Sequence, residues 1–338
     1  MIYIVFHSAD FDGLGSAVIT AAGMGYDDEE RRDLFKFIPY NYQIKLMYDK
    51  EHELVEMIKK GDLIFFVDCF YTKDLGTIKE MINIVGKENF YVIDHHETSL
   101  NWISENCPEI NWSSSENSSD PNNRIGEARS AIALCWKHFY GEMKMPSSVK
   151  LLSNYDAWYN DDKEDWNERI LPYQYGLRNE SFNTGRPWDE YDRLLDILLD
   201  NRRTEVIINN GKVILSFIKS ESKALISKFG KEIKVHADGD DTVYNAFMAP
   251  GHLKNSLVFD GMDEEDKNKY DIFILDRSSA LTEESYLTLF SNKPDINVSK
   301  LAEKVGGGGH KFASGCVVKF ELELESDIPV YKLIEVKK

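Results

Sequence analysis

Three short apolar runs near the N-terminus constrain the fold of this 338-residue chain more than any other feature. They are IYIVF at Ile2–Phe6, LIFFV at Leu63–Val67 and FYVI at Phe90–Ile93. Continuous apolar runs of this length are typical of strands that are buried on both faces, as in a parallel sheet. Helix-like stretches lie between them, at residues 15–23, 51–60 and 72–85. The alternation predicts an α/β fold, with an N-terminal doubly wound domain and a mainly parallel sheet.

Ionisable residues stand where each apolar run stops. His7 follows the first run, Asp68 follows the second, and the triplet Asp94-His95-His96 follows the third. In open α/β sheets, ligands bind beyond the carboxyl ends of the strands. We therefore expect these side chains to point at one crevice.

Further carboxylates extend this set of ionisable residues. Asp10 and Asp12 lie in HSADFDGLGS after the first strand, and Asp156 lies in NYDAW. Oxygen-rich sites with some imidazole suit a divalent cation such as Mn²⁺ or Mg²⁺, and the imidazole favours Mn²⁺. The set is large enough for two ions, which clamp a phosphoryl displacement when they lie ~3.5–4 Å apart.

The composition excludes several other classes of protein. The chain carries 40 Lys+Arg against 58 Asp+Glu, and this net charge of −18 argues against a protein that coats long nucleic acids. Its four cysteines form no CxxC pair, so we expect neither structural zinc nor a disulfide framework, and a cytoplasmic location fits. No apolar stretch reaches the ~18–20 residues of a membrane span. The segment MIYIVFHSADFDG lacks the basic region of a signal peptide.

The length suits two domains and a connector. We expect residues 1–187 to form the metal-binding domain, residues 188–230 a helical connector with a break at Asn209–Gly211, and residues 231–338 a smaller α/β domain with a mixed sheet. Strands are expected in this last part at Thr242–Met248, Tyr270–Leu275, Tyr286–Phe290 and Cys316–Phe320. The Ser/Asn-rich stretch at residues 113–123 predicts a loop.

Taken singly, the polar residues have simpler interpretations. An Asp after a strand is usually a turn or helix-cap residue, and adjacent histidines are often a surface pair. A glycine run such as Gly306–Gly309 is more often a flexible loop than a phosphate cradle.

Taken together, the motifs resemble the DHH phosphoesterase superfamily, named for the triplet that is Asp94-His95-His96 in this chain. HSADFDGLGS resembles its first motif, FFVDCF its second, VIDHHET its third and NYDAW its fourth. GGGGHKFASG resembles the glycine-rich motif of the DHH-associated domain. The family's first motif often has three residues between the His and the first Asp, whereas only Ser8 and Ala9 stand there in this chain. The likeness implies a DHH catalytic domain followed by a substrate-binding DHH-associated domain.

The resemblance also implies roles for the residues at the strand ends. Two divalent ions would be held by His7 and Asp10 on one side, by Asp12, His95 and Asp156 on the other, and by Asp68 as the bridge. His96 would contact the scissile phosphate or assist the leaving group, and Asp94 would orient a histidine. A water between the ions would be the nucleophile.

In the second domain, the resemblance implies substrate contacts. The predicted substrate-binding residues are Arg277, Ser278, Gly307, Gly308, Gly309 and His310. Successive N–H groups of the glycine run would form an anion-binding nest, and the guanidinium of Arg277 would match a phosphate.

Within this family, the acidic charge favours a two-metal exonuclease or phosphodiesterase that hydrolyses short oligonucleotides, nanoRNA or short single-stranded DNA, to mononucleotides. Its partner would be such an oligonucleotide or another phosphorylated nucleotide. We expect no association with a membrane. The sequence leaves open whether the protein forms a homodimer. The alternatives are a RecJ-like single-stranded DNA exonuclease, a nucleotide phosphatase, a cyclic-dinucleotide phosphodiesterase and, third, a pyrophosphatase. An inactive scaffold that binds a partner protein is disfavoured by the intact set of ligands.

Overall fold

The computed structural model describes residues 1–40, 53–70, 75–114, 129–159, 161–180, 182, 190–251, 256–278 and 284–336. The chain separates into two compact units, Met1–Ile214 and Leu215–Lys338. The first is built on a parallel sheet and the second on a mixed sheet, which confirms the predicted fold class. The predicted limits of the domains remain a prediction. Most of the predicted Ser/Asn-rich loop and the first two residues of the predicted connector lie outside the described residues.

A parallel sheet forms the centre of the first unit. Among the described residues, the strands run in the order β2-β1-β3-β4-β5, and neighbouring strands are parallel. They are β1 (Ile2–His7), β2 (Phe35–Tyr40), β3 (Leu63–Val67), β4 (Phe90–Ile93) and β5 (Asn111–Ser113). The three predicted strands are confirmed. The sequence reading missed β2, an edge strand that contains Pro39, and β5, which is very short.

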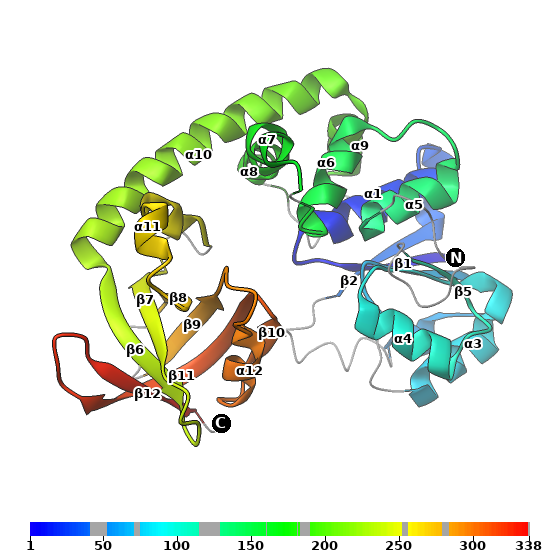
Figure 1. Ribbon diagram of the computed structural model, residues 1–338. Helices are drawn as coiled ribbons and strands as arrows, with labels where there is room; N and C mark the ends of the chain where they lie inside the picture. The colour runs from blue at the N-terminus through cyan, green and yellow to red at the C-terminus, as the bar shows by residue number, and fades with distance from the viewer. Residues whose placement is uncertain are drawn as a thin grey trace. The chain divides into compact units, whose positions relative to one another are not determined.

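Helices cover both faces of this sheet. Ile4 and Phe6 of β1 pack in the core that includes α1 (Phe11–Gly23), whereas Tyr3 and Val5 pack in the core on the opposite face. That second core includes residues of α3 (Leu75–Val85) and α4 (Glu97–Asn106). Figure 1 shows α1 on one side of the sheet and α3 and α4 on the other. Because both faces are covered, Ile2–Phe6 of this strand are all apolar.

The connections of the strands determine where a ligand can bind. After β1 the chain passes through α1 to β2 at one edge, and later returns to β3 on the opposite side of β1. The direction of strand order reverses between β1 and β3, and in such sheets ligands bind at the carboxyl ends beside this reversal. His7, Asp68 and Asp94 stand at the carboxyl ends of β1, β3 and β4.

A second layer of helices packs on the α1 side. It consists of α5 (Ala131–Tyr140), α6 (Ser147–Asp156), the turn Trp166–Ile170, α8 (Leu171–Asn179), α9 (Tyr191–Leu199) and the start of α10 (Asn201–Phe229). The short helix α7 (Lys163–Asp165) has no buried residue and leads into this turn. Among the described helices, none is long and apolar enough to cross a membrane.

Helix α10 is continuous, so the predicted break at Asn209–Gly211 is wrong. A Cβ atom at Gly211 would collide with the backbone oxygen of Pro172, and one at Gly176 of α8 would collide with the backbone oxygen of Ile207. The glycines therefore allow α8 and α10 to approach closely, which is a different use of glycine from ending a helix.

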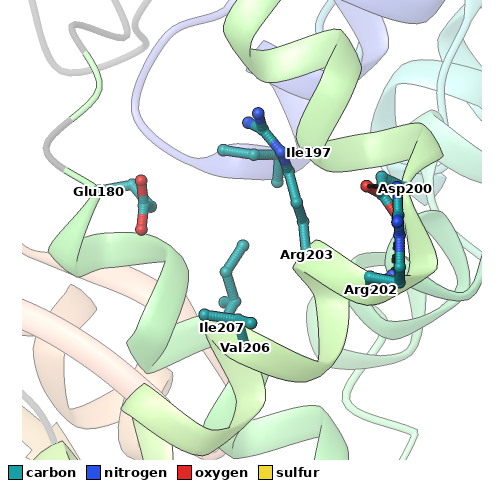
Figure 2. A pocket seen from close by; sticks show the side chains of 7 residues that line it. All are labelled: Glu180, Ile197, Asp200, Arg202, Arg203, Val206 and Ile207. Carbon is teal, nitrogen blue, oxygen red and sulfur yellow. Dashed lines mark hydrogen bonds and ion pairs between the residues drawn. The ribbon is translucent and has the colours of Figure 1, made fainter.

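Helices α9 and α10 leave a surface hollow of about 440 Å³ (Figure 2). It is lined by Glu180, Ile197, Asp200, Arg202, Arg203, Val206 and Ile207. Its two arginines already form ion pairs, Arg202 with Asp200 at 3.4 Å and Arg203 with Asp196 at 3.2 Å. None of the predicted site residues lines this hollow.

A mixed sheet forms the second unit. Within the described residues its strand order is β10-β11-β12-β6-β7-β8-β9, and β9 also pairs with β11. The strands are β6 (Lys231–Ala237), β7 (Tyr244–Pro250), β8 (Ile272–Asp276), β9 (Ser285–Phe290), β10 (Gly308–His310), β11 (Ala313–Leu324) and β12 (Val330–Glu335). Helix α12 (Val298–Glu303) packs against this sheet, and α11 (Glu264–Lys267) is a single turn. The four predicted strands correspond to β7, β8, β9 and β11, whereas β6, β10 and β12 were not predicted.

Replacement of Gly211 should destabilise the first unit. In Gly211→Ala the new methyl group must displace the backbone of α8, and such overpacking costs about 1–3 kcal/mol of the free energy of unfolding. Urea unfolding followed by circular dichroism measures this cost. Asn210→Ala, at an exposed position of the same helix, is the matched control and should leave stability unchanged or slightly raised. Equal stability of the two variants would contradict the close crossing of α8 and α10.

Candidate metal centre

The first group of acidic and imidazole side chains lies where β1 meets α1. His7 ends β1, and Asp10 caps the N-terminus of α1, where its Oδ1 accepts a hydrogen bond of 3.0 Å from the Gly13 N–H. The other oxygen of Asp10 lies 3.3 Å from His7 Nδ1. A Cβ atom at position 13 would collide with the backbone oxygen of His7. Glycine is therefore required for the strand and the helix to meet this closely.

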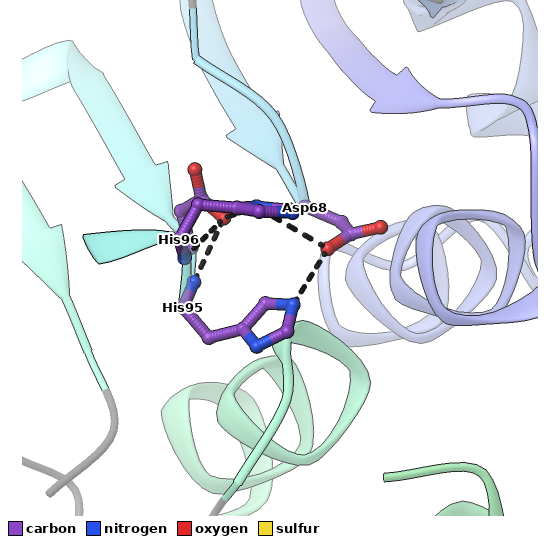
Figure 3. A group of neighbouring side chains, drawn as sticks. Asp68, His95 and His96 are labelled. Atoms are coloured by element: carbon purple, nitrogen blue, oxygen red, sulfur yellow. Dashed lines mark hydrogen bonds and ion pairs between the residues drawn. The ribbon is translucent and has the colours of Figure 1, made fainter. Parts of the chain in front are cut away.

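The carboxylate of Asp68 stands between two histidines. Its Oδ2 lies 3.5 Å from His7 Nδ1, and its Oδ1 lies 3.3 Å from His95 Nε2. Figure 3 shows the imidazole of His95 turned toward this carboxylate. The backbone of Asp68 has a φ of 57°, in the left-handed region that Asp enters more readily than most residues. One oxygen faces each histidine, which is the arrangement required of a carboxylate that bridges two cations.

A second group consists of Asp12, His95 and Asp156. His95 Nε2 lies 3.1 Å from Asp156 Oδ2 and 3.9 Å from Asp12 Oδ2. Asp156 ends α6, whereas Asp12 is buried in the first turn of α1. The carboxylate of Asp12 accepts hydrogen bonds from the N–H groups of Ala131 and Ile132, at 2.9 and 3.2 Å. The N-terminus of α5 thus fixes the orientation of Asp12 and favours its negative charge.

Asp94 is buried behind the two histidines that follow it. Its Oδ1 lies 2.7 Å from His96 Nδ1 and also accepts the N–H groups of His95 and His96, at 2.8 and 3.2 Å. The histidine that Asp94 orients is therefore His96, whose side chain is 33% exposed at the start of α4. A carboxylate that is hydrogen-bonded to Nδ1 fixes the orientation of the ring and therefore the direction in which Nε2 points.

Burial and neighbouring charges oppose each other in this cluster. Burial alone lowers the pKa of His7, but Asp10 and Asp68 outweigh it and raise that pKa to about 10. The same opposition raises the pKa of His95 well above its ordinary value, with Asp156 and Asp68 as the partners. Burial disfavours ionisation of Asp68, but His7 and His95 outweigh it and hold the pKa of this carboxyl well below its usual range.

For Asp12 and Asp156, the contacts with His95 do not outweigh burial. Burial, followed by the charges of Asp68 and Asp156, raises the pKa of Asp12 well above its ordinary value. Burial also raises the pKa of Asp156. Additional positive charge would therefore allow both groups to ionise.

The residues present fit a pair of divalent cations. Asp68 Oδ1 and His95 Nε2 are buried, and within the described part of the chain neither makes a hydrogen bond. Buried polar atoms are nearly always satisfied, so a shared cation suits this pair. The groups His7–Asp10–Asp68 and Asp12–His95–Asp156 each bring their ligand atoms within 4.8 Å of one another. The structure thus brings the predicted ligands together, and their role as ligands stays a prediction.

Comparison with known proteins agrees with this arrangement. Residues 1–154 match the model of the DHH family, N-terminal domain. These residues are a DHH-family domain. The match confirms the resemblance predicted from the motifs and the predicted class of enzyme, a phosphoesterase.

Two curated relatives extend over most of the chain. Protein R106 of Acanthamoeba polyphaga mimivirus is 22% identical over 333 residues, which cover 92% of this chain and 66% of that protein. Oligoribonuclease NrnB of Bacillus subtilis is 23% identical over 335 residues, which cover 95% of this chain and 74% of that protein. Among solved structures, the pGpG-specific phosphodiesterase PggH of Vibrio cholerae is 16% identical, with a TM-score of 0.47 and 94% of each chain covered.

Outside the DHH domain, predicted substrate residues lie on adjoining strands of the second unit. Arg277 follows β8, and its guanidinium donates to the hydroxyl of Thr288 in β9. Thr288 pairs with Gly315 of β11, which pairs in turn with Gly308 of β10, so the register places Arg277 near the glycine motif. The N–H and hydroxyl of Ser278 both donate to the carboxylate two residues earlier.

The predicted nest of glycine N–H groups does not form as expected. The N–H groups of Gly306 and Gly307 donate to the carbonyls of Glu303 and Ala302, at 3.2 and 2.8 Å. These two amides complete the end of α12 and do not line an anion site. Gly308–His310, which includes Gly309, forms β10, and the side chain of His310 lies outside the described part of the structure.

Two residues next to the Asp12–His95–Asp156 group were not predicted from the sequence. Ser130 is the N-cap of α5, and its hydroxyl donates to Asp12. Arg129 precedes it directly. A serine before an apolar helical pattern is a recognisable N-cap signal. No local signal shows that this helix end meets a carboxylate more than a hundred residues away.

Binding of Mn²⁺ should release protons. Because the pKa of His7 is raised to about 10, its imidazole is protonated at neutral pH, whereas a metal binds only the neutral form. Apparent affinity should therefore rise as the pH rises toward that pKa. Isothermal titration calorimetry in buffers of different ionisation enthalpy counts the protons. His138→Ala, outside both groups and with a pKa lowered by burial, is the control that should not change the count. Binding without proton release would contradict this account of the cluster.

Proposed function

We propose that this protein is a phosphodiesterase that hydrolyses short oligonucleotides to mononucleotides with two divalent cations, Mn²⁺ in preference to Mg²⁺. The observation that carries the proposal is the position of Asp68, with one carboxylate oxygen toward each of the two ligand groups. The name of the Bacillus subtilis relative, an oligoribonuclease, supports the class of substrate.

The chain's own residues have distinct tasks in this mechanism. One cation would be held by His7, Asp10 and Asp68, and the other by Asp68, Asp12, His95 and Asp156. When bound, two cations lower the pKa of a water between them and neutralise charge on a phosphate. The N-terminus of α5 keeps Asp12 in place, and Asp94 holds the ring of His96. His96 is proposed to contact the scissile phosphate or the leaving oxygen.

Residues of the second unit are proposed to bind the substrate away from the reacting bond. They are Arg277, Ser278, Gly308, Gly309 and His310, whereas Gly307 is left out because its N–H completes the end of α12. Arg277 is exposed, and a guanidinium can hold a phosphate through two parallel hydrogen bonds. The net charge of −18 supports short substrates, because repulsion of the chain grows with the number of phosphates.

A ladder of end-labelled RNA and DNA, from dinucleotides to thirty-mers, tests the proposed function. With Mn²⁺ we expect the shortest oligonucleotides to be converted fastest, with mononucleotide products. Removal of metal with EDTA should abolish hydrolysis, and added Mn²⁺ should restore it more fully than Mg²⁺. Activity that persists in a chelated sample shown to be metal-free would overturn the metal mechanism. Preferred digestion of the longest DNA would instead favour a RecJ-like exonuclease.

Substitution of Asp68 tests the bridge. Asp68→Asn keeps the shape of the side chain but removes the charge that two cations share, so turnover should fall at least about a hundredfold, or about 2.7 kcal/mol. Steady-state hydrolysis of a dinucleotide measures this loss. Asp62→Asn is the matched control, since Asp62 precedes the same strand and pairs with the N-terminal amine at 2.6 Å. If Asp68→Asn keeps more than about a tenth of the wild-type rate, Asp68 is only a turn residue.

A further inference from the structure

Arg129 is attached at the edge of the Asp12–His95–Asp156 group. It directly precedes Ser130, whose hydroxyl donates to Asp12. The N–H of Ser130 donates to Ser153 Oγ in α6 at 3.1 Å. The residue after Arg129 thus begins α5, whose first turn binds Asp12, and is also hydrogen-bonded to α6, which ends at Asp156.

The guanidinium of Arg129 is held by stacking on an aromatic ring. Its central carbon lies 3.7 Å from the centroid of the Tyr159 ring. Tyr159 follows Asp156 by three residues, and its N–H donates to the carbonyl of Asn154 at 2.8 Å. The stack therefore joins the segment that contacts Asp12 to the segment that carries Asp156.

The charge of Arg129 has no acidic partner within the described part of the chain. Among those residues, its side chain forms neither an ion pair nor a hydrogen bond, although the chain is rich in acids. Among the other described arginines of the first unit, ion pairs are formed by Arg32, Arg169, Arg193, Arg202 and Arg203, whereas Arg178 donates to the hydroxyl of Tyr155. A stacked guanidinium keeps its N–H donors at the rim of its plane, where they match two oxygens of a phosphate.

We propose that Arg129 binds the phosphate group that is hydrolysed at the metal centre. This inference rests on the proposed function and adds to it a substrate contact supplied by the first unit. Stacking on Tyr159 holds the guanidinium in place before the substrate arrives, so that little side-chain entropy is lost on binding. The positive charge compensates the negative charge of the phosphate without adding a metal ligand.

The test compares Arg129→Ala with Arg32→Ala, whose arginine also stacks on a tyrosine, Tyr26, but is paired with Asp192. Both variants are assayed as the Mn²⁺-loaded full chain. Arg129→Ala should lower kcat/KM about 10- to 100-fold, the effect of one lost charge-assisted contact. The loss should be similar on a dinucleotide and on bis-p-nitrophenyl phosphate, which contains a single phosphodiester. Arg129→Lys, which keeps the charge but loses the fork, should fall between wild type and Arg129→Ala. Arg32→Ala should behave as wild type.

Several results would overturn the inference. Unchanged kinetics of Arg129→Ala, or a loss confined to the dinucleotide, would mean that Arg129 does not contact the scissile phosphate. A changed affinity for Mn²⁺, measured by calorimetry, would mean that Arg129 supports the metal centre itself.

Binding of inorganic phosphate separates this inference from the proposed function. If the wild-type chain hydrolyses neither ester, the proposed function fails, and phosphate binding to the Mn²⁺-loaded chain decides about Arg129 alone. Weaker binding by Arg129→Ala than by Arg32→Ala supports the contact, whereas equal binding overturns it.

Discussion

The electrostatic contact between the Asp68 carboxylate and two imidazoles is the interaction on which the rest of the centre depends. Asp68 is buried, with only 2% of its side chain exposed, and its left-handed backbone costs of the order of 1 kcal/mol. Both costs are offset because one oxygen faces His7 and the other faces His95. A single side chain thereby joins ligands that come from β1 and from the loop after β4.

The parallel sheet makes this contact possible. β1, β3 and β4 are neighbours, so their carboxyl ends lie along one edge and present His7, Asp68 and the Asp94-His95-His96 triplet together. Helices supply the remaining groups, since Asp10 and Asp12 lie at the start of α1 and Asp156 at the end of α6. Rigid elements, and not long loops, therefore position the described cluster, as precise binding sites require.

The sequence was sufficient for the parts of the fold that follow from local patterns. Runs such as LIFFV are apolar at every position only when both faces are covered, so the buried strands and their ends could be predicted. Adjacency of the strand ends followed from the parallel sheet. The edge strand β2 could not be recognised in the same way, because FKFIPY mixes Lys36 and Pro39 with apolar residues.

Features that depend on tertiary packing could not be predicted from the sequence. The glycine at position 211 looked like a helix break, but its meaning comes from the approach of Pro172 on another helix. The hydrogen bonds between Asp12 and the start of α5 likewise join distant parts of the chain. In the second unit, the glycine run predicted an anion nest, yet two of its amides serve the end of α12. Local composition does not show which partner a backbone amide selects.

The collision that any side chain at position 13 would make with the backbone of His7 has a consequence for metal selectivity. Gly13 sets the separation between the end of β1 and the first turn of α1, and those two segments carry His7, Asp10 and Asp12. A larger residue would widen this gap by moving backbone, a change that a side-chain rotation cannot reverse. The absence of a side chain at Gly13 thus fixes the spacing between the end of β1 and the start of α1. In the proposed metal centre, this fixed spacing limits how far the ligands can adjust to cations of different radius, such as Ca²⁺ with oxygen ligands at about 2.3–2.6 Å and Mg²⁺ with oxygen ligands at about 2.0–2.1 Å.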